Sequence, residues 1–203
     1  MPTDWEAQYR AGDTPWDKGA PAPPLLDWLE NPAHRFGGRV LVPGCGLGHD
    51  VRAIAATGQA EEVCGLDVSP AALTAARRVP AAASEVYAEA DLFNLPAEFC
   101  GRYDWVFEHT CFCAIDPARR ADYVRAVADV LRPGGQLLAI FYLQPWAGGE
   151  SRPPGGGPPF GAEVAELDAL FAGTFERVEE WTPTRSYAGR EGRELVRLLR
   201  KTE

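Results

Sequence analysis

The stretch Val42-Pro43-Gly44-Cys45-Gly46-Leu47-Gly48-His49-Asp50 decides the fold of this 203-residue chain. It follows a short apolar run at 39–43, and the residues after it, Val51, Ile54 and Ala55, have the spacing of one helix face. The stretch therefore predicts a glycine turn that joins a strand to a helix. Glycines at such a turn let the backbone bend sharply and approach a ligand closely.

The chain on either side of this turn alternates between strand and helix patterns. Apolar runs at 62–67, 84–90, 103–108 and 136–142 predict four further strands, and runs at 175–181 and 194–199 predict a late antiparallel pair. Ser69-Pro70 and Asp116-Pro117 each place a capping side chain before a proline, which is typical of a helix start. We therefore expect an α/β protein with a Rossmann-like, seven-stranded, mostly parallel sheet. A single domain would span 1–203, with an aromatic-rich N-terminal arm at 1–38 and the α/β core at 39–203.

Acidic residues follow the predicted strands where a nucleoside cofactor would bind. Asp67 stands 23 residues after Gly44, the spacing at which a carboxylate accepts hydrogen bonds from ribose hydroxyls. Its alternative role, capping the next helix, is already filled by Ser69. A dinucleotide fingerprint would require glycine where His49 stands, so the pattern favours S-adenosylmethionine (SAM) over a nicotinamide cofactor. Asp91 and Leu92 follow the third strand and are candidates to contact the adenine, the alternative being an ordinary turn.

The segment after the fourth strand, Glu108 to Pro117, is expected beside the reactive part of the cofactor, because ligands of such sheets bind outside the carboxyl ends of the strands. His109 is one of three histidines and is a candidate general base. It is equally a candidate for a neutral wall of the cofactor pocket, and this second interpretation is favoured. No combination of His, Cys and carboxylate residues indicates a metal site.

Composition narrows the class of partner. Lys plus Arg number 20 and Asp plus Glu 29, which gives a net charge of -9 and disfavours a nucleic-acid partner. Five cysteines, with no paired metal-ligand spacing, indicate reduced thiols. We find no signal peptide and no apolar run near the ~20 residues needed to cross a bilayer. The expectation is a cytoplasmic protein, monomeric or weakly dimeric, that acts on a small molecule and binds no membrane.

Several segments resemble one known family. They are Thr14-Pro15-Trp16-Asp17, the glycine stretch at 41–50, Gly65-Leu66-Asp67, Phe112-Cys113-Ala114-Ile115 and Gly156-Gly157-Pro158-Pro159-Phe160. Together they resemble the thiopurine S-methyltransferase superfamily, and within it the thiol/halide methyltransferases. The resemblance implies a class I SAM-dependent methyltransferase with an N-terminal helical lid. It implies that the residues holding SAM are Trp5, Tyr9 and Trp16 over the cofactor, Gly44 and Gly46 at its methionine part, Asp67 at the ribose, Asp91 and Leu92 at the adenine, and Glu108 and His109 near the sulfonium.

The implied reaction is an in-line displacement of the SAM methyl group by a small soft nucleophile such as a thiol, bisulfide, halide or selenium compound. The expected acceptor pocket is small and apolar, formed by Phe112, Tyr142, Trp146 and Phe160. Plant relatives have Trp at the position of Tyr9 and Tyr at that of His109, and this chain has a longer loop at 144–155, so two alternatives stay open. One is a methyltransferase acting on a larger metabolite at O, N or S, with His109 or Glu108 as base. The other is a SAM-binding protein without catalysis.

Overall fold

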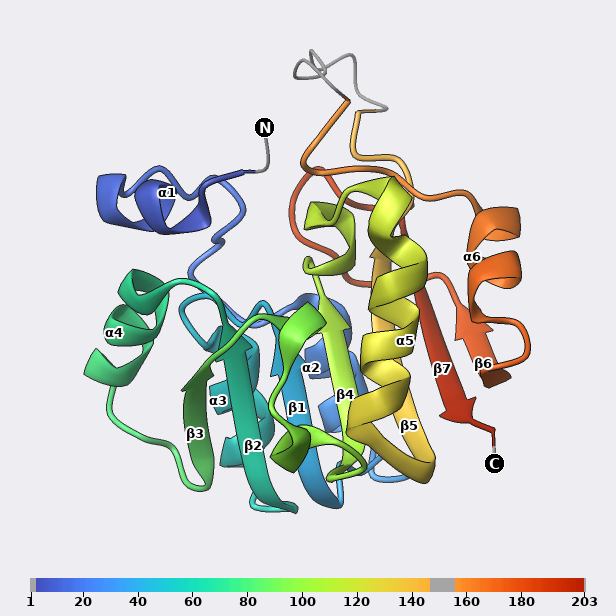
Figure 1. Cartoon of the computed structure of the whole chain (residues 1–203), viewed down its shortest axis with the longest axis horizontal. Coiled ribbons are helices and arrows are strands. Elements are labelled where there is room, and N and C mark those ends of the chain that lie inside the picture. Colours follow the sequence, from blue (N-terminus) through green and yellow to red (C-terminus); the bar gives the residue numbers. More distant parts are fainter. Residues whose placement is uncertain (1–2, 147–155, 203) are drawn as a thin grey trace.

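The computed structural model describes residues 3–146 and 156–202, so most of the long loop predicted at 144–155 lies outside the described residues. Within these ranges the chain forms a seven-stranded sheet of order β3-β2-β1-β4-β5-β7-β6, with β7 antiparallel to both of its neighbours (Figure 1). The predicted mostly parallel sheet with a late antiparallel pair is confirmed. The strands are β1 (Gly38–Pro43), β2 (Ala60–Asp67), β3 (Glu85–Glu89), β4 (Tyr103–His109), β5 (Leu131–Tyr142), β6 (Phe175–Trp181) and β7 (Glu194–Lys201).

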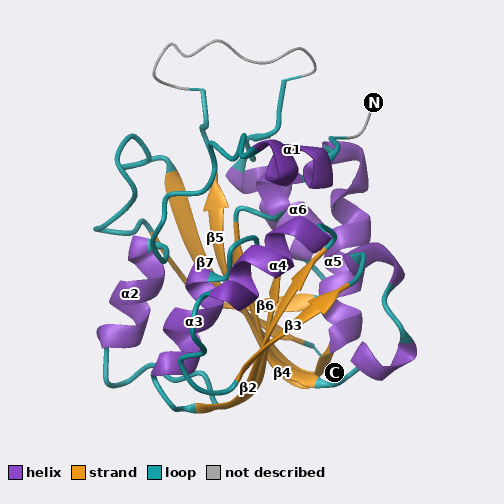
Figure 2. Cartoon of the chain, turned by 90° about the vertical axis from the view of Figure 1, so that its left-hand side faces the viewer, coloured by secondary structure: helices purple, strands orange, loops and turns teal. Residues whose placement is uncertain are grey.

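Helices cover both faces of the sheet (Figure 2). Residues of α2 and α3 pack in one apolar cluster, and residues of α5 and α6 pack in a second cluster with the opposite face. Central strands are therefore apolar along most of their length, as expected for a sheet that is buried on both sides. The α-helices are α1 (Trp5–Ala11), α2 (Pro23–Glu30), α3 (His49–Ala56), α4 (Pro70–Arg78), α5 (Arg120–Val130) and α6 (Val164–Phe171). Short 3₁₀ turns are η1 (Leu92–Asn94), η2 (Ala97–Phe99), η3 (Phe112–Ala114) and η4 (Pro117–Arg119).

Both predicted helix starts carry the expected caps. The Ser69 side chain accepts a hydrogen bond from the N–H of Ala72 at the start of α4. Asp116 caps the 3₁₀ turn η4, which leads directly into α5. The largest difference in a strand boundary is at β5, which begins at 131 and not at 136. Leu131 already pairs with Tyr103, and the intervening Pro-Gly-Gly segment bulges out before pairing resumes at 136.

The direction of β7 brings the C-terminal part of the chain to the edge where the parallel strands end. Because β5 and β7 are antiparallel, Tyr142 at the end of β5 pairs with Glu194 at the start of β7. The segment 182–193 before β7 therefore lies at the same edge as Asp67, the last residue of β2. This edge is where the functional site of such a sheet is expected.

The aromatic residues of the N-terminal arm divide between two locations. Trp28 on α2 is buried and stacks on Trp181, with ring centroids 6.0 Å apart. By contrast, α1 lies beyond the carboxyl ends of the strands, beside α4 (Figure 1). It is attached there by Glu6, whose carboxylate accepts from the Ser69 hydroxyl at 2.6 Å and from the N–H of Ala71 at 3.0 Å. No helix within the described ranges is both long and apolar enough to cross a membrane.

Candidate functional site

The glycine turn between β1 and α3 has the backbone geometry that only glycine adopts without strain. Gly44, Gly46 and Gly48 have φ values of +60°, +51° and +74°. At Gly44 there is also little room for a side chain, since a Cβ would lie 3.0 Å from the Cβ of Cys111. The N–H of Cys45 donates to the carbonyl of Leu66 at 3.0 Å, which fastens the turn to the end of β2.

Asp67 ties this turn to the start of the next helix. Its carboxylate accepts from the N–H of Gly46 at 2.8 Å and from the N–H of Ser69 at 2.9 Å. The side chain is 7% exposed, and burial raises the pKa of Asp67 above its ordinary value although both N–H donors oppose the change. The carboxylate is thus fixed in orientation at the end of β2, where Asp67 lines the cavity described next.

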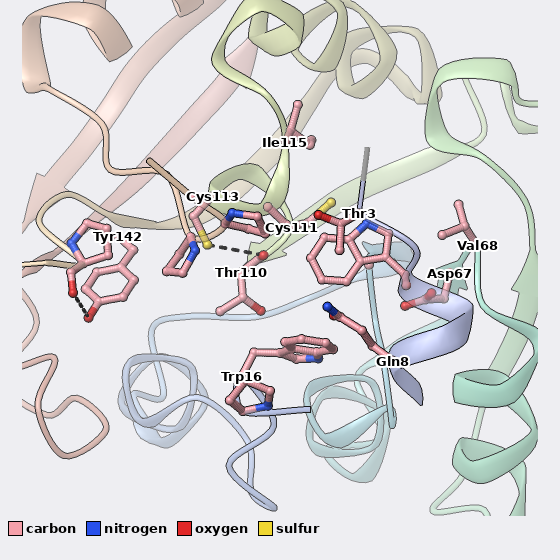
Figure 3. A pocket seen from close by; sticks show the side chains of 18 of the residues that line it. Thr3, Gln8, Trp16, Asp67, Val68, Thr110, Cys111, Cys113, Ile115 and Tyr142 are labelled. Atoms are coloured by element: carbon pink, nitrogen blue, oxygen red, sulfur yellow. Dashed lines mark hydrogen bonds between the residues drawn. The ribbon is translucent and has the colours of Figure 1, made fainter. Parts of the chain in front are cut away.

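A cavity of about 690 Å³ lies over the carboxyl ends of the strands, a volume typical of a small-ligand or cofactor site. Figure 3 shows Asp67 and Val68 at one end, Tyr142 at the other, and Thr110, Cys111 and Cys113 between them. Asp91, Leu92 and Phe93 also line it. The cavity therefore has a carboxylate-bearing end, here called the aspartate end, and a second end at Tyr142, here called the acceptor end.

Three aromatic residues of the N-terminal arm form a further wall of the cavity. Trp16 packs edge-to-face against Trp5, with centroids 5.1 Å apart, and against Tyr9, with centroids 5.7 Å apart. The Trp16 indole N–H donates to the Tyr9 hydroxyl at 3.1 Å. That hydroxyl lies over the glycine turn, since a Cβ on Gly46 would be only 2.6 Å from it. The structure thus brings Trp5, Tyr9 and Trp16 together at the cavity, and their role over the cofactor stays a prediction.

The turn after β4 is held from below by a buried carboxylate. Glu108 is fully buried and accepts from the N–H of Phe112 at 2.7 Å and from the Tyr123 hydroxyl at 2.5 Å. Burial raises the pKa of Glu108 to about 7, in spite of these two donors. The side chain lies beneath the cavity wall and not on it. Its hydrogen bonds instead position the turn that carries Cys111 and Cys113.

Thr110 in this turn has strained backbone geometry. Its φ is +65°, which no other non-glycine residue in the described ranges shares, and Thr is a β-branched residue for which positive φ is unfavourable. Strain of this kind costs roughly 1–3 kcal/mol and is found mostly at functional sites. Here it directs Thr110 and Cys111 into the middle of the cavity.

His109 is not among the residues that line the cavity. Its Nδ1 lies 2.8 Å from a carboxylate oxygen of Asp50, and its side chain is 8% exposed. Asp50 in turn accepts from the N–H of Ala22, so this pair connects β4, α3 and the N-terminal arm. Nε2 is buried and has no hydrogen-bond partner among the described residues. His109 therefore has the contacts of a residue that supports the fold. None of its atoms lines the cavity, where an acceptor would bind.

The four residues predicted for the acceptor pocket separate into two pairs. Tyr142 and Trp146 line the cavity. Phe112 is 2% exposed and packs between Phe141 and Tyr123, because the η3 turn directs it into the core. Phe160 lines a second, neighbouring hollow instead.

Hydrogen bonds fix the acceptor-end wall on both sides of the residues outside the described ranges. The Trp146 indole N–H donates to the carbonyl of Pro159 at 3.0 Å, and the N–H of Phe160 donates to the carbonyl of Cys113 at 2.6 Å. The buried Arg120 donates to the carbonyl of Gly161 at 2.9 Å and forms an ion pair with Glu166 at 2.7 Å. This clamp holds the wall against α5 and α6.

The sequence did not indicate one polar residue of the acceptor end. Arg190 lines the cavity and is 8% exposed, on the segment that precedes β7. Its place depends on the antiparallel pairing of β5 and β7, which no local pattern around position 190 reveals. In the part of the chain that the structure describes, no group of three or more His, Cys, Asp or Glu residues could hold a metal ion.

A doubly wound sheet whose seventh strand is antiparallel, with a glycine turn after β1 and an acidic residue ending β2, defines a Rossmann-like, SAM-binding architecture. The cavity fits SAM in size, in its carboxylates at one end, and in an aromatic wall suited to a sulfonium cation. A solved structure from work on the conversion of a disulfide bond into a thioacetal group during echinomycin biosynthesis has this fold. The match to that structure covers 100% of this chain and 93% of the chain in the solved structure, with a TM-score of 0.81 and 24% sequence identity.

Sequence comparison gives the family. The chain belongs to the thiopurine S-methyltransferase family, whose pattern matches residues 1–194. A thiocyanate methyltransferase 1 of Brassica oleracea is 35% identical, over 97% of this chain and 84% of the relative. A probable thiol methyltransferase 2 of Arabidopsis thaliana is 34% identical, over 82% of this chain and 70% of the relative. Solved structures that share the fold include methyltransferases with bound S-adenosylhomocysteine. The predicted family and cofactor are confirmed: the chain is a SAM-dependent methyltransferase.

Proposed function

We propose that this enzyme methylates a small soft nucleophile: a thiol, bisulfide, thiocyanate, halide or selenium compound. The observation that carries the proposal is the chemistry of the acceptor end. Its described lining includes Tyr142, Pro145, Trp146 and Arg190 together with the neighbouring segments 157–159 and 188–189, and none of these residues carries a carboxylate or an imidazole. The names of the two plant relatives, a thiocyanate and a probable thiol methyltransferase, support the same class of acceptor.

A soft anion suits such a pocket because it arrives already nucleophilic. A hydroxyl or amine acceptor would call for a general base within hydrogen-bond reach. A thiolate or halide requires positioning and removal of water instead. The thiols of Cys111 and Cys113 supply no base either, because burial raises the pKa of both, that of Cys113 to about 12.

We further propose that the aspartate end holds SAM. When bound, SAM supplies a methyl group whose carbon–sulfur bond breaks as the acceptor's lone pair attacks, leaving S-adenosylhomocysteine (SAH). In this proposal Asp67 accepts from the ribose hydroxyls, and Asp91 and Leu92 contact the adenine. Gly44 and Gly46 leave room for the methionine part, and the Trp5, Tyr9 and Trp16 rings exclude water from the sulfonium. Thr110 and Cys111, between the two ends, then face the reacting atoms.

The test of the reaction is a turnover screen with purified enzyme and SAM. Iodide, bisulfide, thiocyanate and small thiols serve as acceptors, and methyl iodide, methanethiol or methyl thiocyanate is measured in the headspace. We expect turnover with at least two of these acceptors. No turnover with any of them, while an O- or N-acceptor is methylated, would refute the proposal.

Two matched aspartates test the proposed cofactor site. Asp91 and Asp116 each cap a 3₁₀ turn by accepting a backbone N–H at 2.9 Å, but only Asp91 lines the cavity. Asparagine keeps the capping oxygen, so both Asp→Asn variants should fold normally. We expect Asp91→Asn to weaken SAH binding in calorimetric titration by about tenfold, the value of one charge-assisted hydrogen bond, and Asp116→Asn to leave it unchanged. Equal affinities for the two variants would contradict the adenine role of Asp91.

A further inference from the structure

The acceptor end contains a buried cation that neither the glycine turn nor the proposed SAM site uses. We propose that Arg190 forms an anion-binding site that holds the negative charge of the acceptor, so that the enzyme selects anionic over neutral soft nucleophiles. This inference rests on the proposed function, because it assigns a charge to the acceptor of that reaction. Arg190 lies four residues before β7, and its guanidinium carbon is 4.7 Å from the centre of the Tyr142 ring.

The guanidinium is packed between aromatic rings, and most of its donors have no partner among the described residues. Its carbon lies near the Tyr142 ring and 5.5 Å from the centre of the Tyr187 ring, so two aromatic rings restrict its position. Among the described residues its ion-pair partner is Glu194, and this contact is long, 3.4 Å from Nη1. Arginine has five N–H donors in a fixed fork, so several remain available for a ligand. A buried cation with spare donors at a cavity wall is suited to an anion.

Glu194 is incompletely satisfied as well. Its side chain is 1% exposed, and its Oε2 is buried without a hydrogen-bond partner among the described residues. The Arg190–Glu194 pair is therefore not a closed, mutually saturating salt bridge, which is the arrangement expected of a purely structural buried pair. Glu194 lowers the net charge at the acceptor end and so limits how tightly an anion binds there.

Charge is distributed unequally along the cavity. Asp67 and Asp91 lie toward one end, and Arg190 lies beside Tyr142 at the other. Lys18 and Asp13 also line the cavity, but both are exposed and of opposite charge, and the Lys18 ammonium group donates to the carbonyl of Pro15 at 2.7 Å. This distribution favours a cationic group at the aspartate end and an anion at the acceptor end, with the turn at Thr110 between them. The two reactants are thereby sorted to opposite sides of the reacting bond.

The experiment measures binding of thiocyanate to the intact enzyme saturated with SAH, by calorimetric titration, so that no turnover is needed. Three single variants are compared with the wild type: Arg190→Gln, Glu194→Gln, and the distant surface variant Arg125→Gln as a control for the loss of one positive charge. Turnover of iodide, an anion, and of thiourea, a neutral soft nucleophile, is measured alongside. SAH affinity of each variant verifies that the aspartate end is intact.

We expect Arg190→Gln to weaken thiocyanate binding at least about tenfold, the value of one charge-assisted hydrogen bond. Its kcat/KM for iodide should fall to a similar extent, whereas that for thiourea and the SAH affinity should change less than about twofold. Glu194→Gln keeps the shape of its residue and removes the opposing charge, so it should bind thiocyanate more tightly than the wild type. Arg125→Gln should match the wild type.

Other results would overturn the proposal. If kcat/KM in Arg190→Gln falls equally for iodide and for thiourea, Arg190 only supports the shape of the pocket. Weaker thiocyanate binding in Glu194→Gln would lead to the same conclusion. If Arg190→Gln does not fold, the double variant Arg190→Gln/Glu194→Gln removes both charges of the pair together, and unchanged thiocyanate affinity in it would overturn the site. Thiocyanate binding through Arg190 without turnover of any acceptor would refute the proposed function and leave the anion site standing.

Discussion

Replacing Glu108 by glutamine tests how the turn that carries Thr110 and Cys111 is supported. Glutamine has nearly the same shape, can accept from the N–H of Phe112 and can pair with the Tyr123 hydroxyl, but it does not ionise. In the folded wild type the pKa of Glu108 is raised from 4.5 to about 7 by burial. An acid of this kind stays protonated in the folded chain after it has ionised in the unfolded chain. The stability of the wild type should therefore fall as the pH rises through this window.

The magnitude follows from the difference between the two pKa values. Each pKa unit corresponds to ~1.4 kcal/mol, so between pH 5 and pH 8 the wild type should lose about 2–3 kcal/mol of unfolding free energy relative to Glu108→Gln. Other titrating groups are common to both proteins and cancel in the comparison. The assay is urea-induced unfolding of both proteins at several pH values across this range.

A second variant, Tyr123→Phe, serves as a control, because it should change the pH dependence of stability in the opposite direction to Glu108→Gln. Tyr123→Phe removes a donor that favours the ionised form of Glu108, so it should increase the loss of stability between pH 5 and pH 8. A free-energy difference between the wild type and Glu108→Gln that stays constant from pH 5 to pH 8 would refute the reasoning. It would mean that Glu108 is ionised in the folded protein throughout this range.

Three further substitutions test the aspartate end and the N-terminal arm. Gly46→Ala places a Cβ 2.6 Å from the Tyr9 hydroxyl at a φ of +51° and should abolish tight SAH binding in calorimetric titration. Gly58→Ala is the control for backbone strain, because Gly58 has a φ of +66° and a Cβ there would meet no atom within 4 Å. Each variant should lose about 1–2 kcal/mol of unfolding free energy from this strain, measured by thermal unfolding. Asp67→Asn should weaken SAH binding about tenfold or more through loss of a buried charge-assisted acceptor, and an unchanged dissociation constant would exclude a contact with the cofactor. Glu6→Gln removes the charge that attaches α1 to α4; it should weaken SAH binding about threefold and speed proteolysis within α1, and an unaltered cleavage rate would argue against this attachment.

Local sequence signals predicted the half of the site that is built from strand ends and their following turns. The glycine turn, the Ser69 cap and the position of Asp67 each depend on a few consecutive residues whose backbone preferences agree with the fold. Because parallel strands end at one edge of a sheet, the prediction of a mostly parallel sheet was enough to expect Asp67 and Asp91 at the same edge, and both line the cavity.

The acceptor end was harder to predict, because its composition depends on long-range packing. Phe112 and Tyr142 are both aromatic residues near strand ends, yet one is in the core and the other lines the cavity. The 3₁₀ turn η3, which directs Phe112 into the core, has no sequence signature. Arg190 is more than 40 residues away from Tyr142 in the sequence and reaches it only through the pairing of β5 with β7. Trp28 and Trp16 likewise differ in location although both belong to the same aromatic-rich arm.

The clamp on the acceptor-end wall has a consequence for how this enzyme could diversify. Trp146 and Phe160 are tied to the wall independently of the residues between them, and Arg120 secures the second of these attachment points to two helices. Doubling the length of a surface connection adds only ~0.6 kcal/mol to the cost of closing it. Evolution or a protein engineer can therefore join Trp146 to Gly156 by segments of different length and chemistry at a cost of this order, while the hydrogen bonds on either side, the cofactor end and the sheet are kept.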